Sequence, residues 1–172
     1  MNKLKFTFLL VMLLTTVTAF AGYAPANVQA ALKKMYPTAD DIAWSQGSGY
    51  YIADFMMDGF DTKVWFQPDG QWAMKQTDWE TMDEVPAAVF NSFAASYYSG
   101  YEVQNVVWVQ FPKWQPIVAV VVGLPNVQTR YLLLLTPYGE FLSERNVTFM
   151  HNILGPATVS YTHLTLPTIC SV

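Results

Sequence analysis

Few side chains in this sequence could carry out acid–base or nucleophilic chemistry. Among 172 residues there are two histidines, His151 and His163, and one cysteine, Cys170. A general base needs a titrating side chain that a partner group positions, and the sequence around His151 offers no such partner. We therefore predict no catalytic residue, and we expect that the protein is not an enzyme.

Three aspartates that lie close together in the sequence, Asp54, Asp58 and Asp61, raise the question of a calcium site. Their spacing differs from the alternating Asp-x-Asp-x-Asp-Gly pattern of a calcium-binding loop. Asp58 is followed by Gly59, and this dipeptide is typical of a β-hairpin turn. The sequence therefore predicts no metal site and no cofactor.

The balance of charge narrows the classes of partner. The chain has 9 lysines and arginines against 13 aspartates and glutamates, which gives a formal net charge of −4. Binding to nucleic acid normally needs a basic face, so we predict no nucleic-acid partner. We interpret the acidic residues between Asp78 and Glu84 as a solvated linker, and an electrostatic contact for a basic partner is the alternative.

The N-terminus has the three parts of a secretory signal peptide. Lys3 and Lys5 precede an uncharged apolar run over residues 6–17, and a small-residue cleavage motif ends at Ala21. A membrane anchor is the alternative, but the apolar run is shorter than the ~20 residues that span a bilayer. We predict that residues 1–21 are removed, that the mature protein is periplasmic or secreted, and that it does not associate with the membrane after cleavage.

The C-terminal end of the sequence does not resemble a natural protein segment. Residues 159–168 resemble the translation of a transposase-type sequencing adapter. A segment of this origin is not part of the native fold, so we interpret residues 159–172, which include His163 and Cys170, as an artefact. A polar native tail is the alternative. Residues 147–158 are then a truncated native C-terminal segment, and the remaining sequence has no cysteine for a disulfide.

One turn motif occurs twice in the chain. Residues 66–72 and residues 135–141 both have the form apolar-x-Pro-x-Gly-x-aromatic. Proline fixes the first turn position and glycine accepts a positive φ, so each copy predicts a tight turn between two strands. The repeat divides the chain into a first module at 22–77, an acidic linker at 78–84 and a second module at 85–146.

Each module is predicted to consist of one helix followed by four antiparallel strands. The first helix begins at Asn27 as its N-cap and ends at Tyr36, whereas the second has Pro86 in its first turn and ends at residues 98–100. The predicted strands are 41–46, 50–57, 61–67, 71–76, 102–110, 115–123, 129–135 and 140–146. The prediction is an α+β fold of two tandem helix-plus-four-stranded antiparallel sheet modules.

The alternation of side chains assigns the two faces of the predicted strands. Tyr51, Ala53 and Phe55 are placed under the first helix, so their sequence neighbours point to the opposite face. Large aromatic side chains on such a face are typical of protein-binding surfaces, and packing in the core or between the modules is the alternative. We predict an open binding face formed by Tyr50, Ile52, Lys63, Trp65, Leu132 and Leu134.

Two strands of the second module show no alternation. Residues 117–122 and 131–135 are continuous apolar runs, which are usual for strands that are buried on both faces. A single helix covers only one of these faces, so the other face needs a cover. The candidates are the sheet of the first module, the C-terminal segment, a second subunit or a binding partner.

Several of these motifs together resemble a known family. They are the helix stripe Val28-x-x-x-Leu32-x-x-x-Tyr36-Pro-x-Ala39, the strand Tyr51-x-Ala53-Asp54-Phe55 and the turn at 66–72. Over residues 28–142 the chain resembles the PepSY-like, beta-lactamase-inhibitor-like family of secreted bacterial proteins, which are typical of gut Bacteroidetes. The resemblance implies tandem modules whose sheets join into one curved surface, and a role in binding or inhibiting extracytoplasmic proteins. Residues 98–100 depart from the family's Pro-x-Ala pattern.

Two functions remain open at this point. The first is a secreted or periplasmic, non-enzymatic protein-binding module that uses the open aromatic and apolar sheet face, with inhibition of the partner as one form of this activity. The alternative is a self-associating structural envelope protein, a homodimer with no separate partner. The first predicts an accessible apolar patch, whereas the second predicts a stable dimer.

Overall fold

The computed structural model describes residues 23–150 and 153–156. The predicted signal peptide, His151 and the predicted adapter residues 159–172 lie outside the described residues. The helices and strands are α1 (Ala26–Met35), β1 (Ala43–Gly47), β2 (Tyr50–Met57), β3 (Phe60–Phe66), β4 (Trp72–Asp78), α2 (Ala87–Ala94), β5 (Glu102–Gln110), β6 (Ile117–Gly123), β7 (Arg130–Leu135) and β8 (Phe141–Asn146). The eight strands agree with the predicted ones apart from shifts at their ends.

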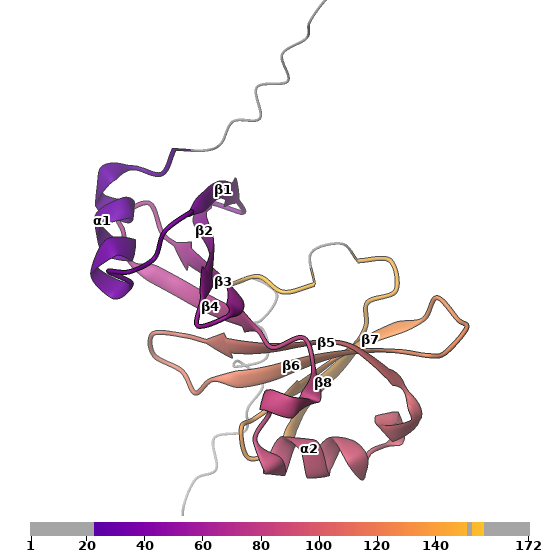
Figure 1. Ribbon diagram of the computed structural model, residues 1–172. Helices are drawn as coiled ribbons and strands as arrows, with labels where there is room; N and C mark the ends of the chain where they lie inside the picture. The colour runs from indigo at the N-terminus through magenta and orange to yellow at the C-terminus, as the bar shows by residue number, and fades with distance from the viewer. Residues whose placement is uncertain (1–22, 151–152, 157–172) are drawn as a thin grey trace, which may run out of the picture.

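The strands of the described chain form one antiparallel sheet of eight strands in the order of the sequence (Figure 1). The α+β class therefore agrees with the prediction. Strand β4 pairs with β5, from Lys75 opposite Gln110 to Asp78 opposite Val107. Because this pairing joins the two predicted modules within one sheet, the division into tandem four-stranded modules stays a prediction.

Both helices cover the same face of this sheet. Figure 1 shows α1 beside the first four strands and α2 beside the last four. The core under α1 contains Val28, Leu32, Ala53, Phe55, Val64 and Phe66. The core under α2 contains Val89, Phe93, Val106, Val118, Val120, Leu133 and Leu135. The strand register places both cores on the same face. Val64 of the first core lies opposite Lys75, and Lys75 lies opposite Gln110. By alternation, Gln110 shares a face of β5 with Val106 of the second core. The other side of the sheet is the helix-free face.

The repeated turn motif has the predicted conformation in both copies. Gly70 has φ 88° and Gly139 has φ 87°, a region that glycine adopts without steric cost. Each turn also lies against the start of a helix. A Cβ atom at Gly139 would be 2.5 Å from the carbonyl oxygen of Ala88 in α2. The glycine is therefore needed both for the turn and for the close approach of helix and turn.

The prediction that Asn27 caps the first helix is wrong. Pro25 occupies the N-cap position, and no side chain caps this end of α1. Asn27 lies inside the first turn, and its Nδ2 donates a hydrogen bond of 2.9 Å to the carbonyl oxygen of Pro68. The asparagine therefore fastens α1 to the β3–β4 turn instead of capping its own helix.

The second helix is shorter than predicted. Pro86 precedes α2, which ends at Ala94, and a separate 3₁₀ helix follows at Tyr97–Gly100. Another 3₁₀ helix at Met82–Glu84 lies within the predicted acidic linker.

The apolar strands are buried on both faces, as predicted. Every residue of Ile117–Gly123 is buried, and so are the last four residues of Arg130–Leu135. Val118, Val120 and Leu133 face α2, and the residues between them point to the helix-free face.

Candidate functional site

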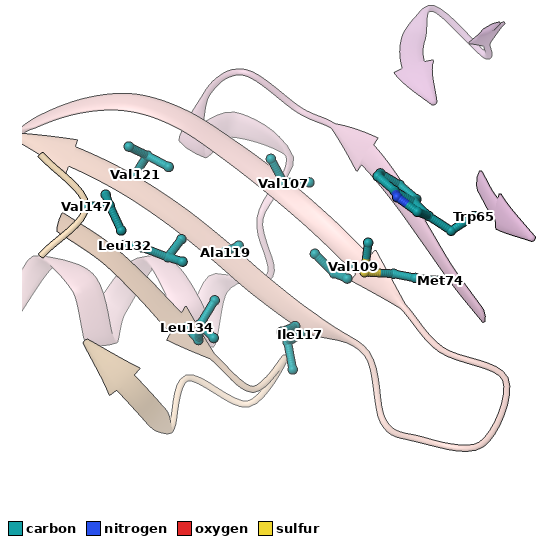
Figure 2. Close-up of a cluster of buried hydrophobic side chains, with 10 residues drawn as sticks. All are labelled: Trp65, Met74, Val107, Val109, Ile117, Ala119, Val121, Leu132, Leu134 and Val147. Atoms are coloured by element: carbon teal, nitrogen blue, oxygen red, sulfur yellow. The ribbon is translucent and has the colours of Figure 1, made fainter. Parts of the chain in front are cut away.

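The helix-free face has an apolar centre that is built from both halves of the chain. Figure 2 shows its buried side chains, which are Trp65, Met74, Val107, Val109, Ile117, Ala119, Val121, Leu132, Leu134 and Val147. Ile153 and Leu154 from the C-terminal segment pack against this cluster. The second face of β6 and β7 is therefore buried within the chain, and Ile153 and Leu154 contribute to its cover.

The structure brings all six predicted binding residues to this face. Ile52 on β2 lies opposite Trp65 on β3, and Tyr50 and Ile52 are half-buried beside the apolar centre. Lys63 lines the same cavity as Trp65. The two leucines of β7 belong to the centre itself.

The expected openness of the face is wrong for three of the six residues. Trp65 exposes 7% of its surface, Leu132 exposes 4% and Leu134 exposes 3%. All three belong to the buried apolar cluster of this face, against which Ile153 and Leu154 pack. The accessible part of the predicted face is consequently restricted to the β2–β3 region.

A polar strip lies beside the apolar centre on the same face. Lys63 Nζ forms an ion pair of 3.1 Å with Asp54 Oδ2. Asn105 Nδ2 donates a hydrogen bond of 3.0 Å to Asp78 Oδ2, and Asp78 Oδ1 accepts one of 2.9 Å from the backbone N–H of Glu80. Asp78 therefore orders the chain after β4, although its sequence position suggested a solvated linker.

Two polar atoms of this strip are buried without a hydrogen-bond partner among the described residues. They are Gln76 Nε2, a donor, and Asn105 Oδ1, an acceptor. The bond from Asn105 Nδ2 to Asp78 fixes which end of the Asn105 amide is unpaired. Buried polar groups are usually paired, so an unpaired donor and acceptor in one region need an explanation.

The apolar centre and the polar strip meet at a cavity of about 370 Å³. Gln76, Asp78 and Asn105 line it on the polar side, and Ile52, Trp65, Val107, Val121, Ile153 and Leu154 line it on the apolar side. A group that enters this cavity would contact apolar side chains and amide groups together.

Several aromatic residues outside this face pack in the core under α2. The rings of Trp79 and Trp108 stack with centroids 5.1 Å apart, and both pack against the core under α2. Burial, followed by a hydrogen bond to Glu144, raises the pKa of Tyr98 to about 12. A hydrogen bond with its neighbour Tyr97, followed by burial, raises the pKa of Tyr101 to about 12. Both phenols are therefore harder to deprotonate than an ordinary tyrosine.

Several solved structures from Bacteroides species share this fold. A DUF2874 family protein from Bacteroides uniformis is 68% identical, with a TM-score of 0.78 over 80% of this chain and 99% of that chain. The chain belongs to the DUF2874 family. A scan against protein-family models finds no match, and a search of curated proteins finds none.

Two further solved structures extend the comparison of this DUF2874 protein. A protein from Bacteroides eggerthii, whose name places it provisionally in the periplasm, is 66% identical with a TM-score of 0.78, over 80% of this chain and 99% of that chain. A BLIP-like protein from Bacteroides fragilis is 33% identical with a TM-score of 0.72, over 78% of this chain and 96% of that chain. The beta-lactamase-inhibitor-like part of the resemblance is supported, and the PepSY part is not.

These neighbours are consistent with a non-enzymatic periplasmic protein. Within residues 23–150 and 153–156, no helix of this DUF2874 protein is long and apolar enough to span a membrane. The same residues contain no group of three or more histidine, cysteine, aspartate or glutamate side chains that could hold a metal ion.

Gln76 and Asn105 were not among the predicted site residues of the DUF2874 chain. The sequence carries a signal for them, because each is a polar residue at a position where alternation would place an apolar one. Gln76 follows Met74 by two residues, and Asn105 precedes Val107 by two residues. Asn105 was harder to assign, because the register between β5 and β6 shifts between Val103 and Asn105.

Proposed function

We propose that this DUF2874 protein binds another protein on the helix-free face, in the periplasm, after removal of residues 1–21. It acts without catalysis, and the likeness to a BLIP-like protein supports inhibition of the partner as the form that this binding takes. The contact region is the part of the face around the cavity. Tyr50, Ile52 and Lys63 are its accessible residues, and the buried Trp65 lies beside Ile52 on the neighbouring strand.

The unpaired donor and acceptor beside accessible apolar residues carry this proposal. A buried polar group without a partner costs free energy, because it has lost its hydrogen bonds to water. Gln76 Nε2 and Asn105 Oδ1 impose such a cost on the free protein. A partner that offers one carbonyl and one N–H group would remove it, which makes binding more favourable at this place than elsewhere on the surface.

An extended segment of a partner protein meets these requirements. Its backbone presents N–H and C=O groups in alternation, and its side chains alternate between two sides. Aliphatic side chains would contact Ile52, Trp65 and Val107, which line the cavity. The residues Ile153 and Leu154 already place aliphatic side chains at this cavity, and this supports an apolar segment as the occupant.

The structure gives less support to self-association. That alternative rested on apolar strands that would pair two subunits. Strands β6 and β7 are buried within a single chain, so they have no apolar surface left for a second copy. A homodimer would have to use another surface.

A pull-down combined with light scattering tests the proposal. The bait is the chain from Gly22 to Thr158, and the extract comes from the envelope of the source cells. We expect a monomer that captures one protein in a one-to-one ratio. The bait Ile52→Glu/Lys63→Glu should lose this capture, because it places two carboxylates at the contact region.

Phe90→Ser is the matched control, because Phe90 is an apolar residue of α2 that is 50% exposed and lies away from the helix-free face. It should capture the same protein as the unmodified bait. Capture that survives Ile52→Glu/Lys63→Glu in a folded bait would refute this face as the contact region. A tight dimer that captures nothing would support the structural envelope protein instead.

A further inference from the structure

We propose that a second site on this protein binds a small anionic amphiphile, a compound with an apolar body and one acidic group. The site is a groove of about 800 Å³ between the end of α1, the β3–β4 turn and the loop that connects β5 to β6. This volume lies within the range of about 300–1,000 Å³ that is usual for small-molecule sites. The groove shares Tyr50 with the proposed contact region of the helix-free face, but the proposal does not require that a protein binds there.

The walls of the groove are mainly aromatic and aliphatic. Met35 contributes from α1, Tyr50 from β2 and Trp72 from β4, and Phe111 and Trp114 contribute from the β5–β6 loop. Aromatic side chains offer large flat surfaces for the apolar part of a ligand. A small hydrated anion would leave these walls unused, so an apolar body belongs to the expected ligand.

The charge of the lining sets the sign of the ligand. Lys34 and Lys113 line the groove, and no aspartate or glutamate does so among the described residues. Both charged residues of the lining are thus basic, in a chain with 13 acidic and 9 basic residues. The ion pair found in the described part of the chain joins Lys63 to Asp54, so neither lysine of the groove is neutralised there by a carboxylate within 4.0 Å. Two ammonium groups beside an apolar wall favour a ligand that carries a negative charge.

One wall of the groove is held in place before any ligand arrives. The backbone N–H of Gln67 donates to the carbonyl oxygen of Gln71 at 2.7 Å, and the N–H of Gly70 donates to that of Gln67 at 2.9 Å. Asn27 Nδ2 holds the same turn against α1 through Pro68. A wall that is already ordered loses little entropy on binding, which favours affinity for a small ligand.

The acidic residue of this turn does not oppose an anion directly. Asp69 accepts hydrogen bonds from the backbone N–H of Gln71 at 2.9 Å and from Gln71 Nε2 at 3.1 Å. It is not among the residues that line the groove. The repeated turn motif thus supplies a rigid wall, and the amides of Gln67 and Gln71 add hydrogen-bonding groups to it.

Two dyes of the same framework test the proposal. The anionic probe is 8-anilinonaphthalene-1-sulfonate, and the neutral probe is N-phenyl-1-naphthylamine, which lacks the sulfonate. Fluorescence titration should show saturable one-to-one binding of the sulfonate dye. Lys34→Gln/Lys113→Gln should weaken its affinity about fivefold or more, as expected for the loss of two exposed charge contacts. The neutral dye should change by less than about twofold, because these substitutions keep the apolar walls.

Matched controls separate this site from general surface binding. Lys33→Gln removes a neighbouring exposed lysine of α1 that does not line the groove, and it should leave both affinities unchanged. Trp114→Ser should weaken both dyes. Tyr138→Ser removes an exposed aromatic residue from the other turn and should weaken neither.

Three results would overturn the proposal. The first is sulfonate-dye binding that is absent or does not saturate at one equivalent. The second is that Lys33→Gln lowers the affinity for the sulfonate dye as much as Lys34→Gln/Lys113→Gln does. The third is that Lys34→Gln/Lys113→Gln lowers the affinity for the neutral dye as much as the affinity for the sulfonate dye. The titrations use the chain from Gly22 in two versions, ending at Val172 and at Thr158. Binding that occurs in only one of them would also refute a site formed by the residues named above.

Discussion

The unpaired amide of Gln76 predicts that the free protein is less stable than it could be. Gln76 Nε2 is buried and has no hydrogen-bond partner in the described part of the chain. A buried donor of this kind costs about 1–3 kcal/mol. Methionine has nearly the same length and shape but no donor, so Gln76→Met removes this cost and keeps the packing. Because the side chain as a whole is only partly buried, we expect the lower end, a gain of about 1 kcal/mol.

Chemical denaturation measures this gain directly, with the midpoint and the slope fitted separately. The thermal midpoint should rise by about 3 °C, which corresponds to 1 kcal/mol in a chain of this size. Gln46→Met is the matched control, because Gln46 is an exposed strand residue whose donor can bind water, and it should stay within about 0.5 kcal/mol of the unmodified protein. The same Gln76→Met bait should capture less partner, since it no longer offers the donor. Unchanged or reduced stability of Gln76→Met would show that Gln76 is satisfied in the free protein and would remove the main support for the proposed contact region.

Two further predictions concern the fold. Gly139→Ala should destabilise the protein by about 2–4 kcal/mol through backbone strain and the clash with Ala88. Gly59 has the same φ of 87° but no atom within 4 Å of the new Cβ, so Gly59→Ala should cost only about 1–2 kcal/mol. Equal losses of stability in urea titrations of the two variants would contradict the role of the close approach. The raised pKa of Tyr98 stabilises the fold fully below the ordinary tyrosine pKa of about 10, and this contribution is lost as pH rises through about 12. Denaturation midpoints between pH 9 and pH 12 should therefore fall less steeply for Tyr98→Phe, and an unchanged slope would argue against the raised pKa.

Local patterns in the sequence were sufficient for most of the fold. Period-two alternation located the strands and their two faces, and the proline and glycine positions located both turns. Such local patterns do not predict contacts between residues that are far apart in the sequence. Asn27 was predicted to be a helix cap because asparagine is a preferred N-cap residue and stands just before the apolar stripe, but its side chain binds Pro68, which is 41 residues away. A propensity rule considers only neighbouring residues, so it could not choose between the two roles.

The same difference between local patterns and long-range contacts applies to the candidate site. Alternation placed Trp65, Leu132 and Leu134 on the correct face, but it could not show that they are buried. Their burial depends on the pairing of β4 with β5 and on the contact with Ile153 and Leu154, which are tertiary features. The sequence therefore predicted which residues share a surface and did not predict which of them a partner could reach.

The helix-free face changes character along the sheet, and this change locates the contact region. In the first half the strands present the polar residues Asp54, Lys63 and Gln76 beside the apolar residues Ile52 and Trp65. In the second half they present residues such as Ala119 and Val121, which the protein itself must cover. A partner that contacts only the polar side chains of the first half would gain little from apolar burial, and a partner on the second half would have to displace existing core contacts. Only at the boundary can one segment bury apolar surface and also pair the unpaired amides. The cavity lies at this boundary, and for this reason the contact region is assigned there.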